Sequence, residues 1–305
     1  MKCFLNFCLA ILISSNLFSQ GCSDAGFCTI GNIQSNKDDT LKVKNKWSIF
    51  LTNGIGDQGV YVFTPGIQYE HTADSNWSFQ SKITANYASG NLGNAVGLGD
   101  LFLSTTYLLK TDKKLKNSFT IGAKLPLNLG DIRNGDKPLP MIYQSSLGTI
   151  DLIVGYKAAL KRFALNLAWQ QPLTGINRNT FLPEYVNTPE AFEYPSSNDF
   201  KRKGDVLLRI GYQLIAKKRL NWNTSILSIY HLGEDTYVNG NVSNSPINIA
   251  GSAGLTVNIT SMLLYTINKS ITIGISGGFP IIVRDVRPDG LTRAFSISPE
   301  LSINF

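Results

Sequence analysis

The chain has 305 residues, of which 43% are hydrophobic, with a mean hydropathy of −0.01 and a formal net charge of +7. This length allows one large β domain or two average domains, and the composition excludes a disordered chain. After Ile13 no apolar run approaches the roughly 20 residues that a membrane helix needs, which excludes a helical membrane protein. The basic residues cluster at short connectors rather than beside exposed aromatics, so no nucleic-acid partner is expected.

The amino terminus is typical of a secretory signal peptide. Lys2 precedes the mostly apolar stretch 4–13, and the small and polar residues of "SSNLFSQ" follow it. We place cleavage after Ser19 or Gln20 and assign 1–19 to the signal. A buried amino-terminal helix is the alternative.

Export would leave Cys22 and Cys28 as the cysteines of the mature chain, since Cys3 and Cys8 lie in the signal. Two cysteines six positions apart in an oxidising compartment predict one small disulfide loop. Lipidation of Cys22 is the alternative, although Ser19 stands where the usual site has Leu. A cysteine pair without nearby histidines is half a ligand set, so neither a metal nor a cofactor is expected.

Apolar and polar residues alternate through most of the remaining chain, 43–305. Side chains alternate across a strand with a period of two, so each such stretch predicts a β-strand with one apolar and one more polar face. The pattern predicts twelve strands, at 45–54, 60–71, 77–87, 100–110, 118–126, 149–160, 163–170, 204–216, 220–232, 250–267, 270–283 and 293–305.

The connectors between these strands form two classes that alternate along the chain. One class is short, at 72–76, 110–116, 161–162, 217–219 and 268–269; the other is longer, at 88–99, 127–148, 171–203, 233–249 and 284–292, with 55–59 as its short member. Transmembrane barrels have short periplasmic turns and longer external loops. Their sheet must close, because hydrocarbon cannot satisfy an open edge. We therefore predict an all-β fold, a transmembrane antiparallel up-and-down β-barrel in the outer membrane of a Gram-negative-type envelope.

Six aromatic residues lie near the short connectors and predict a girdle at one membrane interface: Trp77, Tyr107, Tyr156, Tyr212, Trp222 and Tyr265. Aromatic core packing in a β-sandwich is the alternative. Such a core has no reason to hold its rings at one level relative to the turns.

The predicted inward positions carry charges of both signs, at Glu70, Lys82, Lys124, Asp151, Lys157, Arg209 and Glu300. Charges inside a barrel must be paired or hydrated. The lumen is therefore either a polar passage whose charges set solute preference or a filled interior, and twelve strands are intermediate between filled and open barrels. Residues 20–42 either fold into this lumen as a plug or hang in the periplasm as a tether.

Four stretches resemble the outer-membrane family named for the MetA pathway of phenol degradation: "GLGDLFLSTTYLL" (97–109), "GAKLPL" (122–127), "TIDLIVGYKAALKRFALNLAW" (149–169) and "KGDVLLRIGYQL" (203–214). The resemblance implies a channel or transporter without catalytic residues. The last strand, "SISPELSINF", looks like the signature that outer-membrane assembly machinery reads. We expect a channel for passive uptake of small molecules, including hydrophobic or aromatic ones, with membrane lipid, the solute and that machinery as partners.

Two other functions stay open. The 171–203 loop carries four prolines and the aromatics Phe181, Tyr185, Phe192, Tyr194 and Phe200, so a structural or adhesive barrel that acts through its loops is the main alternative. A barrel phospholipase would need a Ser nucleophile with a His and a polar orienter. The two histidines are His71, in "EHTADSN", and His231, which with Glu234 and Asp235 is interpreted as a rim charge cluster. We therefore expect no enzymatic activity.

Overall fold

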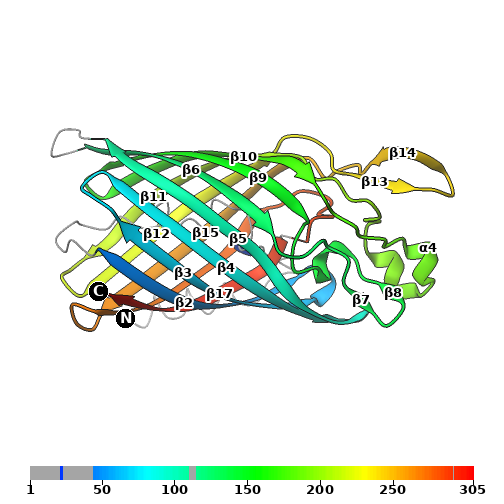
Figure 1. Ribbon diagram of the computed structural model, residues 1–305, viewed down its shortest axis with the longest axis horizontal. Coiled ribbons are helices and arrows are strands. Elements are labelled where there is room, and N and C mark those ends of the chain that lie inside the picture. Colours follow the sequence, from blue (N-terminus) through cyan, green and yellow to red (C-terminus); the bar gives the residue numbers. More distant parts are fainter. Residues whose placement is uncertain (1–20, 23–43, 110–114, 291) are drawn as a thin grey trace, which may run out of the picture.

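The computed structural model describes residues 21–22, 44–109, 115–290 and 292–305. The predicted signal peptide and Cys28 lie outside this part of the chain. In the described part, long antiparallel strands form a tilted barrel wall (Figure 1). These strands are β2 (Asn45–Gly56), β3 (Tyr61–Thr72), β4 (Trp77–Gly90), β5 (Gly93–Leu109), β6 (Leu115–Pro126), β9 (Thr149–Leu160), β10 (Phe163–Gly175), β11 (Asp205–Ala216), β12 (Leu220–His231), β15 (Gly254–Thr266), β16 (Ile271–Ile282) and β17 (Thr292–Asn304).

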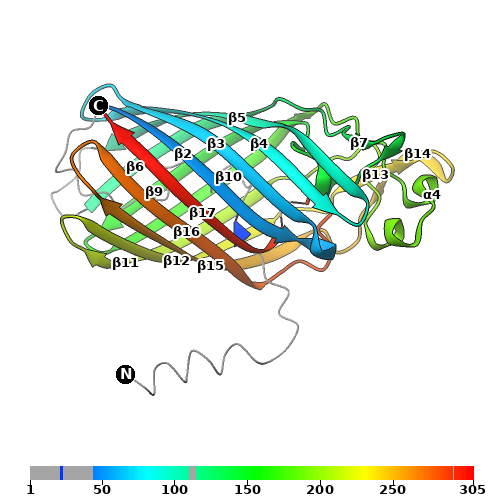
Figure 2. The same ribbon diagram turned by 90° about the horizontal axis from the view of Figure 1, so that it is seen from below.

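The barrel is closed by pairing of the first and last long strands. Figure 2 shows β17 lying between β16 and β2, and its register with β2 runs from Arg293↔Gly56 to Asn304↔Lys46. This ladder is interrupted between Phe295 and Glu300, where a hydroxyl–hydroxyl hydrogen bond of 2.8 Å joins Thr52 to Ser298. The two-residue strand β1 (Gly21–Cys22) also pairs with the start of β17. The predicted twelve-stranded closed antiparallel barrel is therefore confirmed.

One predicted loop is wrong. Residues 88–99 do not form a long connector, because β4 and β5 continue through them to a tight turn with Gly90 opposite Gly93. Gly93 has a φ of +122°, a conformation that side chains with a Cβ rarely adopt. The Gly- and Asn-rich composition of this stretch is typical of loops and hid the continuing alternation.

The two faces of the wall meet different surroundings. Along β2 the side chains of Trp47, Ile49 and Leu51 are exposed on the outside, whereas Lys46 and Ser48 are buried on the inside. Similar exposed apolar side chains recur on the other strands. Such a surface is solvated by hydrocarbon and not by water, so the barrel spans the outer membrane. No helix in the described ranges is long and apolar enough to cross a membrane.

The long connections lie together at one end of the barrel, opposite the short turns and the carboxy terminus (Figures 1 and 2). We call them the outer cap, comprising 127–148, 176–204, 232–253 and 283–290. The cap contains η3 (Met141–Tyr143), α4 (Pro183–Val186), η4 (Pro189–Glu193) and the short strand pairs β7 (Arg133–Asn134) with β8 (Lys137–Pro138) and β13 (Thr236–Asn239) with β14 (Ser243–Asn248).

The cap has a core of its own and fills the barrel mouth. Residues 139–149 are all buried, and Ser145 donates a hydrogen bond of 2.6 Å to the carbonyl of Leu98 on β5. Their apolar side chains pack with Phe181 and Tyr194 from the 176–204 loop and with Val62 of β3. The predicted 171–203 loop is thus largely an ordered lid: Phe181, Tyr194 and Phe200 are buried, while Tyr185 and Phe192 are exposed.

Candidate functional site

The predicted lumen residues are distributed around the inner wall and do not form one site. They lie on β3 (Glu70), β4 (Lys82), β6 (Lys124), β9 (Asp151 and Lys157), β11 (Arg209) and β17 (Glu300). Lys82, Lys124, Asp151 and Arg209 are buried, and the other three are partly buried. A distributed set of this kind does not converge on one reacting atom, and its role in lining a solute path stays a prediction.

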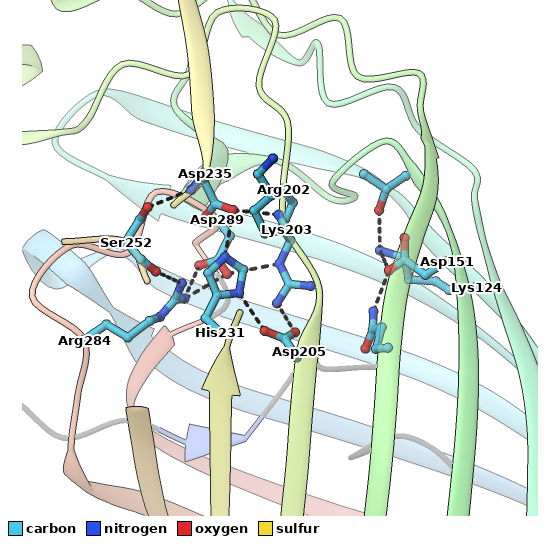
Figure 3. A network of polar contacts seen from close by, with 12 residues as sticks. Lys124, Asp151, Arg202, Lys203, Asp205, His231, Asp235, Ser252, Arg284 and Asp289 are labelled. Atoms are coloured by element: carbon cyan, nitrogen blue, oxygen red, sulfur yellow. Dashed lines mark hydrogen bonds and ion pairs between the residues drawn. The ribbon is translucent and has the colours of Figure 1, made fainter. Parts of the chain in front are cut away.

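Lys124 and Asp151 form a buried ion pair between neighbouring strands. The Lys124 Nζ lies 2.9 Å from Asp151 Oδ2, and the two side chains are 1% and 0% exposed. Lys124 also donates to Thr149 Oγ1 at 2.9 Å, and Gln170 Nε2 donates to Asp151 Oδ2. The second carboxylate oxygen, Oδ1, is buried and has no hydrogen-bond partner among the described residues. This strongly polar contact lies where the wall meets the outer cap (Figure 3).

A second group of polar contacts lies toward the short-turn end. Lys46 Nζ is 2.7 Å from Glu70 Oε1, which also accepts a hydrogen bond from Gln68. Lys82 Nζ lies 4.1 Å from the centroid of the Phe50 ring, within the range of a cation–π contact. The Phe50 ring covers Gly66, where a Cβ would lie only 2.0 Å from Phe50 Cζ. A glycine is needed there for the ring to lie flat on the wall.

Three polar side chains stand in one cross-strand row on the inner wall. Asn166 of β10 is directly opposite Lys157 of β9 and Arg209 of β11. Within the described part of the chain, Asn166 Oδ1 is buried without a hydrogen-bond partner. Two cationic side chains thus flank a buried amide on this part of the inner wall.

The lumen wall also contains an apolar patch that the sequence reasoning missed. Phe102, Ile153, Ala168, Leu207 and Leu227 are buried together, with Ile229 packed against them. Phe102 and Leu227 interrupt the polar side of the alternation on β5 and β12, which is the signal that could have revealed the patch. These five side chains are at most 4% exposed, so they pack on one another inside the barrel and are covered from solvent.

His231 belongs to a buried network at the base of the cap (Figure 3). Its side chain is 1% exposed, with Nδ1 2.6 Å from Asp205 Oδ1 and Nε2 2.8 Å from Asp235 Oδ1. Only an imidazolium can donate from both ring nitrogens at once, so this arrangement suits the charged ring. The predicted rim cluster is therefore a buried one, with Asp205 as a partner that the sequence did not indicate.

Two arginines extend this network to the other loops. Arg202 contacts Asp205 and, at 3.3 Å, Asp289, while Arg284 lies 2.9 Å from Asp289 Oδ2. Burial alone would raise the pKa of Asp289, but the charges of Arg284 and Arg202 hold that pKa below its usual range. Arg284 also donates to the carbonyl of Ser252 at 2.7 Å. We name Arg202, Asp205, His231, Asp235, Ser252, Arg284 and Asp289 the cap-base network, since they tie three cap loops to β11 and β12.

The predicted aromatic residues lie near the short turns, several of them in tilted cross-strand ring contacts. The ring centroids of Trp77 and Tyr107 are 4.7 Å apart, and Trp222 and Tyr265 are 40% and 42% exposed. Tyr156 and Tyr212 contact Phe119 and Phe163, with centroids 5.0 and 4.9 Å apart. Sequence reasoning missed Trp47 and Tyr69, whose centroids are 4.8 Å apart.

The remaining histidine, His71, lies beside the short-turn end, where its Nδ1 is 2.8 Å from Asn45 Oδ1. In the described ranges, no group of three or more His, Cys, Asp or Glu side chains is placed so that it could hold a metal ion. The Cys22–Cys28 pairing lies outside the described residues and stays a prediction.

The closed wall, its apolar outside and its polar inside define an integral β-barrel of the outer-membrane type. No family model and no curated protein matches the chain, so the resemblance to the MetA-pathway family stays a prediction. Solved structures do match. The NanC porin aligns with a TM-score of 0.50 and 9% identity over 85% of this chain and 98% of its own. The KdgM porin (TM-score 0.44, 8% identity, 85% and 99% covered) and the translocator domain of the autotransporter NalP from Neisseria meningitidis (0.43, 9%, 88% and 90%) also align. At these identities the likeness is one of fold.

Proposed function

We propose that this protein is a gated outer-membrane channel through which small solutes pass by diffusion. The observation that carries the proposal is the polar inner wall, with ion pairs near both ends, Lys46–Glu70 and Lys124–Asp151. A membrane barrel does not need charges inside to be stable, and each costs desolvation unless it is paired or hydrated. Further charged side chains lie on the same inner wall, at Lys82, Lys157 and Arg209, and this polar lining supports a path for water and solute.

In this proposal the outer cap is the gate. Residues 139–149 fill the mouth and bind the inner wall, so solute passes only when these loops move. The cap-base network holds the loops to the barrel. The amino-terminal segment 20–42 is proposed as a second obstruction, supported by the pairing of β1 with β17.

The finer proposal is that the solute is a small molecule with an apolar or aromatic part. The apolar patch around Phe102 and Leu227 supports it: the patch is buried in this structure, and it would offer an apolar contact inside an otherwise polar wall once the cap moves. Membership of the MetA-pathway family, proposed on sequence resemblance, points the same way. Recognition of the last strand by assembly machinery and a lipid-facing role for the aromatic girdle also remain proposals.

Conductance of the refolded protein in planar bilayers tests the proposal. The full chain, a variant lacking 22–42 and a variant with 132–146 replaced by a short Gly-Ser linker are compared. We expect rare or small openings in the full chain and steady conductance once the gate is removed. A chain that folds as a barrel but stays silent in all three forms would contradict a channel and favour a filled barrel.

A second candidate is an adhesive barrel that acts through its surface loops. Tyr185 and Phe192 favour it, because they are 58% and 59% exposed on the cap, where aromatic side chains are frequent anchors of protein contacts. Loss of cell adhesion in Tyr185→Ser and Phe192→Ser variants with unchanged conductance would favour this function. We propose no enzymatic role, since both nitrogens of His231 are held by carboxylates.

A further inference from the structure

A cavity of about 660 Å³ lies at the outer rim, between the β2–β3 turn and three segments of the outer cap. It is bounded by η2 (Asp57–Gly59), by η3, by the end of η4 and by 285–288. Much of its wall is apolar, including Pro140, Met141, Ile142 and Val286. The volume is within the range of small-molecule sites in proteins.

Two contacts hold these segments around the cavity. Arg287 binds Asp57 in a bidentate manner, with Nε 3.0 Å from Oδ2 and Nη2 2.6 Å from Oδ1. Gln58 donates from Nε2 to the backbone carbonyl of Glu193 at 3.3 Å, and its own φ of 53° lies in the left-handed region. The cavity is therefore built by four separate segments, the β2–β3 turn and three parts of the outer cap, and is not a gap beside one of them.

The charged groups around the cavity are mainly acidic. Three carboxylates line it, Asp57, Glu193 and Asp285, against one guanidinium, Arg287. Glu193 and Asp285 are exposed, whereas Asp57 is partly buried. Burial raises the pKa of Asp57 even though Arg287 opposes this shift, so an additional cation nearby would stabilise the ionised form.

We propose that this cavity binds small organic cations that carry an apolar body. The cationic group would lie near the carboxylates of Glu193 and Asp285, and the body would pack on Met141, Ile142 and the neighbouring prolines. A neutral molecule of the same shape lacks the first contact, and an anion is repelled by the acidic rim. The site goes beyond the proposed channel function and does not depend on it, because binding at the rim requires no passage.

Calorimetric titration of the refolded full chain in a non-ionic detergent tests this site. Benzyltrimethylammonium is the probe, with benzyl alcohol and benzoate as neutral and anionic comparisons. We expect saturable one-site binding of the cation and weaker binding of both comparisons. Glu193→Gln and Asp285→Asn should each weaken binding about two- to fivefold, and the pair about tenfold. Ala294→Phe, which places a ring in the cavity, should abolish it.

Glu190→Gln is the matched control, because Glu190 is exposed on the same η4 segment and does not line the cavity. It should bind the cation as the parent does. Equal affinity for benzyl alcohol, unchanged affinity in the double variant, or no saturable binding in a correctly folded barrel would each overturn the proposal. Conductance of these variants is read separately, so a failed binding test leaves the channel proposal standing, and the reverse also holds.

Discussion

Lys124 and Asp151 show how one pair of residues can have opposite effects on stability. Both side chains are almost fully buried, and Lys124 Nζ lies 2.9 Å from Asp151 Oδ2. Removing one charge leaves the other buried without its partner, which typically costs about 3–5 kcal/mol, whereas replacing both by apolar groups is often neutral or stabilising. The pair is therefore expected to set the local geometry of the wall more than its net stability.

We predict that Asp151→Asn lowers the free energy of unfolding by about 3 kcal/mol or more, while the Lys124→Met, Asp151→Leu double variant stays close to the parent. Urea unfolding of the micelle-bound barrel, followed by Trp fluorescence, measures both. Glu70→Gln is the control: its pair with Lys46 is less buried, so its loss should be smaller. A double variant as unstable as the single one would show that the pair itself stabilises the fold.

At the scale of elements, the cap-base network joins the loops of the outer cap to the strands of the barrel. The cap loops form no continuous hydrogen-bonded ladder with the described barrel strands. They are held instead by Arg202, His231 and Arg284, which bind carboxylates on strands and on other loops. Asp289 is central, since two arginines bind it. Its protonation state should therefore control how firmly the cap is attached.

We predict that the cap loosens in acid. The pKa of Asp289 is below its usual value in the folded protein, so its contribution to stability is complete above about pH 4 and is lost as the pH falls further. The unfolding midpoint in urea is measured at several values between pH 2 and pH 7. Asp289→Asn should be less stable than the parent at pH 7, and the difference between them should shrink as the pH falls from 4 to 2. Parallel profiles for the two proteins would contradict this role of Asp289.

At the scale of the whole molecule, the barrel separates two solvents. Ile121 is 53% exposed on the outer face of β6, about halfway along the strand, and Ser104 lies on the inner face of the neighbouring strand β5. The two positions are at nearly the same height, but one faces lipid and the other faces the lumen.

A charge at these two positions should thus have different effects. We predict that Ile121→Arg destabilises the barrel by about 2–4 kcal/mol, whereas Ser104→Lys has a clearly smaller effect. Reversible unfolding in lipid vesicles, with the folded fraction read from heat-modifiable gel migration, measures both. Equal losses at the two positions would mean that the lumen at this height is as dry as the membrane.

The sequence predicted the wall much better than the cap. Strand positions follow from the alternation of apolar and polar side chains, because every second residue of a strand faces lipid. This pattern is local and is repeated in each strand. The packing of Tyr143 on Tyr194 joins two loops far apart in the chain and leaves no local pattern. The contact of His231 with Asp205 depends on the register between β11 and β12. The lumen charges were predicted by the same alternation, but their pairing, as in Lys124–Asp151, depends on the register between strands. The rim cavity, built from the β2–β3 turn and three cap segments, could not be predicted in this way.

The closing contact between β2 and β17 joins residues from opposite ends of the chain: the hydroxyl pairs Thr52–Ser298 and Ser48–Ser302 span 246 and 254 positions. Contacts so distant in sequence form late, because a long loop must be closed before they add any stability. Until β17 arrives, β2 presents an unpaired edge that can bind other chains. A truncated or stalled chain would expose this edge throughout its lifetime. Timely delivery of the last strand is therefore expected to limit aggregation as well as to complete the barrel wall.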